Sequence, residues 1–212
     1  MTDPDQQSKE ATRQRLIEAA IEVFATKGYH GAAVDDIIRV SDTSKGTFYF
    51  HFPNKHGVFL VLIDALAGLL ERDVEAAIGD ESGGLAKVDA ALRAVIGTLA
   101  RHRKLAKILL VEAVGVGPGL DEKLLQIHER FANLIKSHLE RAIAEGSAAP
   151  VDAELAAYAW LGAVNEILIR WLYTGKPDPL EAAIPELRNL LLRSVGARSL
   201  GRGAVPTPVV AT

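Results

Sequence analysis

A short segment, residues 44–55 with the sequence SKGTFYFHFPNK, concentrates side chains that could bind nucleic acid. Lysine and threonine can hydrogen-bond to base edges, tyrosine and histidine can donate to phosphate oxygens, and glycine lets a backbone approach closely. Residues 43–63 contain two lysines, two histidines and no aspartate or glutamate. Because the whole chain has a net charge of −3, we expect contact with nucleic acid to be local to this segment.

The composition argues against several other kinds of chemistry. The chain of 212 residues has no cysteine, which excludes disulfides, thiolate zinc sites and a cysteine nucleophile. It also lacks the motifs G-x-x-x-x-G-K-[ST], G-x-S-x-G and H-E-x-x-H. His128 beside Glu122 or Glu129 could form a metal or acid–base site, but a solvated polar helix face explains this group better. We therefore expect no catalytic residue, no metal and no cofactor.

The sequence gives no signal for secretion or membrane insertion. The first ten residues, MTDPDQQSKE, are polar and acidic, unlike a secretory signal peptide. The apolar runs VFLVLI and LAAYAWLGAV are both much shorter than a membrane span. These features predict a cytoplasmic protein that does not use a membrane as a partner.

Hydrophobic periodicity predicts helices along the chain and no strand. The expected fold class is all-α, with about nine helices separated by breaks such as GDESGG, GVGPG, GSAAP and TGKPDP. The expected helices span residues 9–27, 34–41, 45–51, 55–78, 85–101, 104–114, 120–145, 152–173 and 179–195.

The first three of these helices have the lengths and spacing of a tri-helical helix-turn-helix. Helix 9–27 carries an apolar stripe at i, i+3, i+4 spacing, and Gly28 supplies a left-handed stop. Ser44 can cap helix 45–51, which is too short to be stable unless it docks on the other two. We expect this short helix to be the one presented to a DNA groove.

This N-terminal unit resembles the tetracycline-repressor (TetR) family of transcriptional regulators. The matching motifs are A-x-x-x-F-x-x-x-G-Y in residues 20–29, V-x-x-I in residues 34–37 and S-K-G-T-F-Y-F-H-F-x-x-K in residues 44–55. The resemblance covers about the first quarter of the chain in detail, and the remainder matches in helix order and length. It implies a DNA-binding domain of three helices and a helical C-terminal bundle that dimerises and binds a ligand.

The resemblance also implies roles for individual side chains. Lys45, Gly46 and Thr47 occupy positions that meet bases or neighbouring phosphates, and Tyr49, His51 and Lys55 occupy positions that hold the DNA backbone. The complete set of expected DNA-contacting residues is Ala33, Val34, Ser44, Lys45, Gly46, Thr47, Tyr49, Phe50, His51 and Lys55.

Three positions depart from the family pattern. The second helix is preceded by Ala32 and Ala33 where a threonine or serine is usual, so a phosphate contact there would have to come from a backbone N–H. Asp42 stands where the turn usually has glycine, but aspartate can adopt left-handed conformations, so the turn should survive. Phe50 either packs on a thymine methyl group or faces the protein core.

The expected domain organisation places the helix-turn-helix at residues 9–55 and a ligand-binding and dimerisation domain at residues 56–197. Residues 1–8 and 198–212 are expected to be disordered tails, because they show no hydrophobic periodicity.

The last two helices are the expected dimer interface. Small residues along the eighth helix would allow a partner helix to approach closely, and leucines along the ninth would complete a four-helix bundle between two subunits. The expected interface residues are Ala159, Gly162, Ala163, Leu187, Leu190 and Leu191. Packing of the same stripes within one subunit is the alternative.

The resemblance places a ligand pocket among the fourth to eighth helices, where the candidate side chains are mainly apolar. Such a lining implies an apolar effector, for example an acyl chain, an aromatic compound or a lipophilic drug. The C-terminal helices look like those of family members that regulate lipid or acyl-CoA metabolism. The candidate lining residues are Leu66, Leu70, Leu92, Ile96, Ile127, Phe131, Leu134, Trp160, Asn165 and Leu168.

Together these features predict a sequence-specific DNA-binding transcriptional regulator. The expected partners are double-stranded palindromic operator DNA, a second copy of the chain and a small apolar effector. The expected mode is repression relieved when the effector shifts helix 55–78, which joins the two domains. The alternative is an all-helical ligand-binding or catalytic protein whose DNA-binding domain is degenerate.

Overall fold

The computed structural model describes residues 4–79 and 81–197. Within these residues the fold is all-α, as predicted, and contains nine α-helices, a π-helix (η1) and a 3-10 helix (η2). The elements are α1 (Pro4–Gly31), α2 (Val34–Ser41), α3 (Lys45–His51), α4 (Lys55–Gly79), α5 (Gly84–Arg101), α6 (Arg103–Lys107), η1 (Ile108–Glu112), α7 (Pro118–Ala144), α8 (Ala153–Thr174), η2 (Leu180–Ala183) and α9 (Ile184–Ser194).

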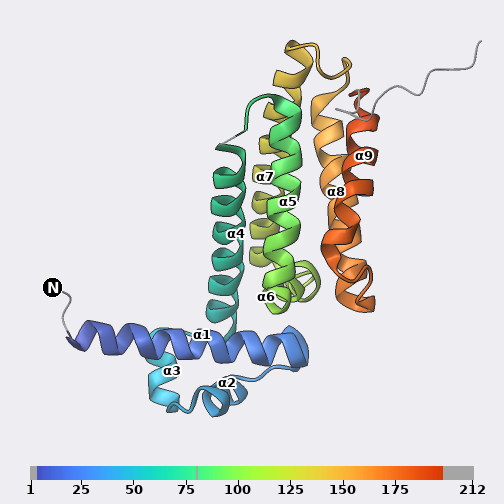
Figure 1. Ribbon diagram of the computed structural model, residues 1–212. Helices are drawn as coiled ribbons and strands as arrows, with labels where there is room; N and C mark the ends of the chain where they lie inside the picture. The colour runs from blue at the N-terminus through green and yellow to red at the C-terminus, as the bar shows by residue number, and fades with distance from the viewer. Residues whose placement is uncertain (1–3, 80, 198–212) are drawn as a thin grey trace, which may run out of the picture.

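Figure 1 shows a small N-terminal unit below an upright bundle of helices. Helix α1 lies across the base with α2 and α3 beneath it, and α4 rises from this unit to become part of the upright bundle. In the bundle α4 packs against α5, α5 packs against α7, and α7 packs against α8. The helix that leaves the small N-terminal unit is therefore also a wall of the large one.

Aromatic and aliphatic side chains hold the N-terminal unit together. Leu16 and Phe24 of α1, Ile37 of α2 and Phe48 of α3 are all 0% exposed. The Phe24 ring meets the Phe59 ring of α4 edge to face, with 4.9 Å between centroids. Burial of each such side chain stabilises the unit by roughly 1.5–3 kcal/mol, which is what keeps a helix as short as α3 in place.

Helix α1 is longer than predicted. It begins at Pro4, whereas the sequence predicted a helix from residue 9 and a disordered segment before it. Proline is compatible with the first turn of a helix because the N–H groups there have no partner within the helix. Gly28 has φ 71°, which interrupts the helix at the predicted stop, and one further turn continues to Gly31. The predicted tail of residues 198–212, like residues 1–3, lies outside the described residues.

Two C-terminal segments also differ from the prediction of continuous helices. The segment predicted as helix 104–114 is a short α6 followed by the π-helix η1. The segment predicted as helix 179–195 is the 3-10 helix η2 followed by α9, with Pro185 in the first turn of α9. Proline cannot donate a backbone hydrogen bond to the preceding turn, so the helix starts anew there.

No helix among the described residues has the length and apolar character needed to cross a membrane. Over the same residues, histidine, aspartate and glutamate side chains do not form any group of three or more that could hold a metal ion.

Candidate nucleic-acid interface and ligand cavity

Helix α3 is anchored by one face and exposed on the other. Phe48 and Phe52 are 0% and 3% exposed and pack into the N-terminal core, whereas Tyr49 and Phe50 are 48% and 70% exposed. Of the two positions considered for Phe50, the structure therefore gives the outward one. The helix presents polar and aromatic groups to the surroundings because its apolar contacts are confined to the Phe48 side.

The start of α3 is capped as the sequence predicted. The Ser44 hydroxyl accepts a hydrogen bond from the Thr47 backbone N–H at 3.1 Å, and the two hydroxyl groups lie 2.8 Å apart. Gly46 is exposed, and the nearest atom to a Cβ built there would be Ser44 Oγ at 3.8 Å. Nothing in the described part of the chain therefore requires glycine at this position.

The two lysines of this region have different surroundings. The Lys45 side chain is 68% exposed, and its Nζ is 3.7 Å from the Asp35 carboxylate, a surface pair of small energetic weight. Lys55 Nζ donates to the backbone carbonyls of Tyr29 and Ala32 at 2.7 and 2.9 Å and lies 4.4 Å from the centre of the Tyr29 ring. The structure thus brings Lys45 to the surface and uses Lys55 to tie the end of α1 to α4.

Helix α2 is capped without the usual hydroxyl side chain. The Asp36 carboxylate accepts a hydrogen bond from the Ala33 N–H at 3.1 Å and is 2.6 Å from Lys27 Nζ. Its hydrogen bond to Lys27, helped by the one from Ala33, holds the pKa of Asp36 below its ordinary value. Ala33 is exposed and Val34 is half-buried at this end of the helix.

The turn between α2 and α3 keeps its geometry despite the missing glycine. Asp42 is left-handed, with φ 50° and ψ 49°, and its N–H donates to the Ile38 carbonyl. This confirms the prediction that aspartate can fill the turn position. A shallow hollow separates α3 from the start of α1 and is lined by Ser8, Lys9, Thr12, Gly46, Thr47, Phe50 and His51.

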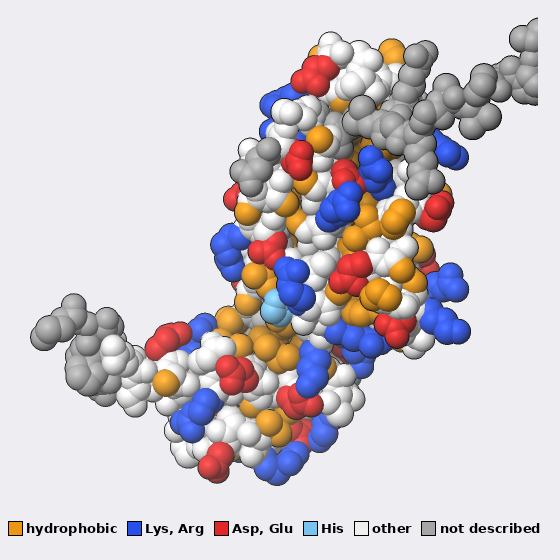
Figure 2. Space-filling model, in the orientation of Figure 1, with side chains coloured by type: hydrophobic (Ala, Val, Ile, Leu, Met, Phe, Trp, Pro, Cys, Tyr) orange, Lys and Arg blue, Asp and Glu red, His pale blue; other side chains and the backbone are white. Residues whose placement is uncertain are grey.

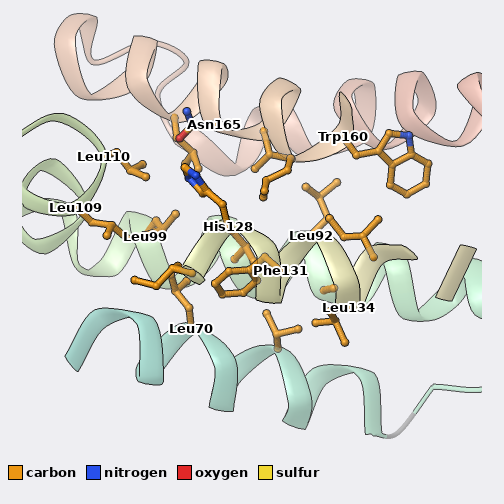
Figure 3. Close-up of a pocket in the computed structure, with 18 of the residues that line it drawn as sticks. Leu70, Leu92, Leu99, Leu109, Leu110, His128, Phe131, Leu134, Trp160 and Asn165 are labelled. Atoms are coloured by element: carbon orange, nitrogen blue, oxygen red, sulfur yellow. The ribbon is translucent and has the colours of Figure 1, made fainter. Parts of the chain in front are cut away.

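A second hollow lies inside the bundle. It is an apolar cavity of about 220 Å³ between α4, α5, η1, α7, α8 and α9, shown in Figure 3. Eight of the ten predicted residues line it: Leu70, Leu92, Ile127, Phe131, Leu134, Trp160, Asn165 and Leu168. Leu66 and Ile96 do not line it, since both are fully buried in the core beside it.

Several lining residues escaped the sequence prediction. Leu109 and Leu110 come from the π-helical segment, whose geometry the periodicity did not reveal. Among the polar lining residues, Lys87 and His138 were not predicted, and His128 had been assigned to a solvated helix face. His128 is exposed, so it lies where the cavity meets the surface.

The segment α6–η1 connects the cavity to the N-terminal unit. The Glu112 carboxylate accepts a hydrogen bond from the Tyr29 N–H at 3.3 Å, and Lys107 Nζ donates to the Ala25 carbonyl at 2.7 Å. A Cβ at Gly28 would lie 2.6 Å from Glu112 Oε2, so glycine is needed there for this approach as well as for its positive φ. The same π-helical segment therefore touches both the cavity and the end of α1.

The outer faces of α8 and α9 combine small and large apolar groups. Leu155 of α8 and Leu190 of α9 are 69% and 60% exposed, and Tyr158 and Tyr173 are also exposed. Figure 2 shows hydrophobic side chains among charged ones over this part of the bundle. Of the six predicted interface residues, Ala159, Gly162 and Leu190 are exposed and Ala163 is half-buried, but Leu187 and Leu191 are buried within the subunit. Leu191 in fact lines the cavity.

Comparison with protein families gives two matches. Residues 16–62 match the family described as "Bacterial regulatory proteins, tetR family", and residues 81–192 match "Tetracyclin repressor-like, C-terminal domain". The chain is 29% identical over 166 residues to the HTH-type transcriptional regulator SrpR of Pseudomonas putida, covering 78% of this chain and 76% of that protein. It is 24% identical over 182 residues to the fatty acid metabolism regulator protein of Bacillus subtilis, covering 85% and 94%.

Solved structures agree on the fold. FadR of Bacillus subtilis, solved in complex with stearoyl-CoA, superposes with a TM-score of 0.76 at 24% identity and covers 84% of this chain and 96% of that chain. A tetR-family regulatory protein from Rhodococcus RHA1 superposes with a TM-score of 0.77 at 21% identity, covering 89% and 98%.

Proposed function

Because this chain belongs to the TetR family of bacterial regulatory proteins and is a DNA-binding transcriptional regulator, we propose that it works as a homodimeric repressor released from its operator by an apolar effector. We propose the domain boundary near Lys55, so that residues 9–55 read DNA and residues 56–197 bind the effector and the second subunit.

The observation that carries the DNA-binding part is the exposed face of α3. Phe48 fixes the helix in the core, and Tyr49 and Phe50 point away from it. Lys45 and Thr47 would reach base edges or neighbouring phosphates, while Tyr49 and His51 would contact the backbone. The exposed Ser44 and the N-terminus of α2 would add contacts to phosphate, with the Val34 N–H as the donor at α2 because the Ala33 N–H is held by Asp36.

Lys55 has a different role in this proposal. Its ammonium group is engaged by two backbone carbonyls, so it would position α1 and α3 for DNA rather than contact a phosphate. Phe50, at 70% exposure, would make an apolar contact, for which a thymine methyl group is the matching partner.

A two-fold dimer would place two copies of α3 on successive turns of a palindromic operator. The exposed faces of α8 and α9 support this assembly, because leucine and tyrosine side chains stand beside the exposed Ala159 and Gly162. A Cβ at Gly162 would meet nothing within 4 Å in the subunit, which leaves room for a partner helix. Leu190 is the ninth-helix residue best placed for this interface.

The cavity supports an apolar effector. Its lining is mainly leucine, isoleucine, valine and aromatic side chains, and the relative solved with stearoyl-CoA shares the fold. We propose that effector binding displaces η1, which carries Leu110 at the cavity and Glu112 at Tyr29, together with α4. The movement would reach the DNA-binding unit through η1 and through α4. It would change the distance between the two DNA-binding units of the dimer.

A mobility-shift assay on the DNA upstream of the chain's own gene tests the proposal at two salt concentrations. A working repressor binds one sequence tightly at both, whereas a degenerate domain gives weak binding that salt abolishes. Thr47→Ala should reduce the preference for that sequence more than it reduces binding to unrelated DNA, and Ser137→Ala on α7 serves as the control. Equal binding of all sequences by the unmodified protein would favour the alternative of a ligand-binding or catalytic protein.

A further inference from the structure

The cavity is apolar along most of its length, but it has polar groups at two places on α7. Lys87, near the start of α5, and His138, near the end of α7, line one part of it, and His128 and Asn165 line the part near Leu110 of η1 (Figure 3). The start of α5 and the end of α7 lie at the end of the bundle away from the N-terminal unit (Figure 1). None of the described lining residues is an aspartate or a glutamate. The side chains that could face the polar part of a ligand are therefore cationic or neutral.

His138 has an unsatisfied ring nitrogen, and the charged groups that act on it are positive. Its Nδ1 atom is buried and has no hydrogen-bond partner among the described residues. Lys87 from α5 and Arg141 from α7 are the charged groups close enough to affect it, and both are positive. Burial, followed by these two cations, holds the pKa of His138 below its ordinary value. An unsatisfied buried donor or acceptor destabilises the protein, so a ligand that pairs with it gains binding free energy.

The other polar group has a different character. In Figure 3 the imidazole of His128 and the amide of Asn165 point toward each other across the cavity. His128 is ten residues before His138 on the same helix, which corresponds to roughly 15 Å along the axis. Apolar side chains such as Phe131, Leu134 and Ile135 fill the interval.

From this arrangement we infer that the effector is an elongated anionic amphiphile, whose negatively charged head group binds between Lys87 and His138 while its apolar body extends along α7 toward His128. This inference rests on the proposed role of the cavity as the effector site. It goes beyond that role by fixing the sign of the ligand's charge and the end of the cavity that the head group occupies.

The charged groups at this end of the cavity argue against a cationic ligand. A lipophilic cation would meet Lys87 and Arg141 with no carboxylate in the lining to pair with, and burying an unpaired charge is strongly unfavourable. A neutral alcohol could hydrogen-bond to His138 or to Lys87 but would form no ion pair with the lysine. A carboxylate gains both a hydrogen bond and an ion pair in a partly desolvated site.

Three probes of equal chain length separate these cases: dodecanoate, dodecanol and dodecylamine, each below its micelle concentration. We would measure binding to the full-length protein by isothermal titration calorimetry. The inference predicts that dodecanoate binds at least tenfold more tightly than dodecanol, and that dodecylamine binds most weakly. Equal affinities, or tighter binding of the amine, would overturn the charge assignment while leaving an apolar effector site intact. If none of the three binds, both the effector site and the head-group assignment are overturned.

Substitutions at Lys87 and His138 test where the anionic head group of the ligand binds. Lys87→Met removes the charge but keeps an unbranched side chain of similar length, so it should weaken dodecanoate binding about tenfold and leave dodecanol binding unchanged. His138→Leu should also reduce the preference for dodecanoate over dodecanol. Lys176→Met removes the same charge from an exposed position outside the cavity and serves as the control. Equal losses for both probes in Lys87→Met, or an equal loss in the control, would overturn the location.

Discussion

Glu112, in the π-helical segment that lines the cavity, accepts a hydrogen bond from the backbone N–H of Tyr29 in the DNA-binding unit, at 3.3 Å. The two residues are 83 positions apart in the sequence. Lys107 lies 3.6 Å from the same carboxylate and also holds the Ala25 carbonyl. A movement of η1 caused by a ligand would therefore act directly on the end of α1, where the helix-turn-helix begins to turn.

Replacing Glu112 tests this connection. Glu112→Ala removes the acceptor for Tyr29 while leaving the cavity lining intact, so the protein should bind dodecanoate as before. The loss of DNA affinity that dodecanoate causes should become at least threefold smaller, because the coupling between two sites is set by the contacts that distinguish their two states. Mobility-shift assays with and without dodecanoate measure this loss of DNA affinity. Glu129→Ala, at an exposed position on α7, is the control, and an unchanged response in Glu112→Ala would remove η1 from the mechanism.

Gly46 separates the requirements of folding from those of DNA binding. A Cβ added there would have its nearest neighbour at 3.8 Å, so Gly46→Ala should fold normally and gain up to about 1 kcal/mol of stability from the lower entropy of the unfolded chain. Its DNA affinity should fall at least tenfold because the added methyl group stands where the backbone would approach DNA. Thermal melting and mobility shift measure the two effects. Gly119→Ala is the matched control on α7, and unimpaired DNA binding by Gly46→Ala would contradict the proposed orientation of α3.

Lys45 and Lys55 should respond in opposite ways to the same substitution. Lys45→Met should weaken binding to all DNA sequences and lower the salt slope by about 1, with stability changed by less than about 0.5 kcal/mol. Lys55→Met should lower the free energy of unfolding by about 1.5–3 kcal/mol, because hydrogen bonds from a charged group to Tyr29 and Ala32 are lost. Denaturant titrations and mobility shifts at several salt concentrations distinguish the two. If the Lys55→Met protein has normal stability but binds DNA with a reduced salt slope, the result would support the phosphate contact that the sequence predicted for Lys55.

The dimer interface can be tested with two equally simple changes. Leu190 on α9 and Leu125 on α7 are 60% and 55% exposed, so either can become glutamate without disturbing the subunit core. Leu190→Glu should weaken dimerisation at least tenfold, because it buries a carboxylate at the proposed interface, whereas Leu125→Glu should have no effect. Sedimentation velocity over a range of protein concentrations measures the association. Unmodified protein that remains a monomer at every concentration would refute the assembly.

His138 should make stability depend on pH. Its pKa is lowered in the folded protein from an ordinary value of 6.5, chiefly by burial and then by Lys87 and Arg141. Well above pH 6.5 the imidazole is neutral in both states. As the pH falls through 6.5 the unfolded chain takes up the proton first, so stability decreases until the lower folded pKa is reached. The contribution is at most about 1.4 kcal/mol per pH unit.

Denaturant titrations between pH 7.5 and about 5 measure this slope. His138→Gln should flatten the pH dependence, and His102→Gln, at an exposed position, is the control. A slope that is the same in His138→Gln and in the unmodified protein would show that other groups account for it.

Local signals in the sequence were sufficient for the two short helices of the DNA-binding unit. The bounds of α2 and α3 were predicted to the residue, because Ser44 caps α3, Pro53 follows it and the apolar spacing is regular. The left-handed turn at Asp42 was also predicted, because the family pattern places a turn there and aspartate can adopt that conformation. Such features depend on neighbours a few residues away, so they can be inferred without the fold.

The tertiary structure decided what distant side chains do. Lys55 has the residue type of a phosphate contact, but its ammonium group is held by the carbonyl of Tyr29 at the end of α1 and by that of Ala32 in the connection to α2. Leu66 and Ile96 are apolar residues like those around the cavity, and only packing assigns them to solid core. Leu187 and Leu191 belong to the leucine pattern of α9, yet they face inward because α9 also has its own subunit to pack against.

Sequence periodicity identified most of the helices, since a helix records in its spacing which face is apolar. The motifs in residues 20–55 carried the resemblance to the family. Periodicity could not reveal the link between Glu112 and Tyr29, nor the gathering of Lys87 and His138 at one end of the cavity, because each joins separate elements of the fold. Which apolar face meets another helix, a ligand or a second subunit is settled by how the helices pack in space, and the amphipathic pattern is the same in all three cases.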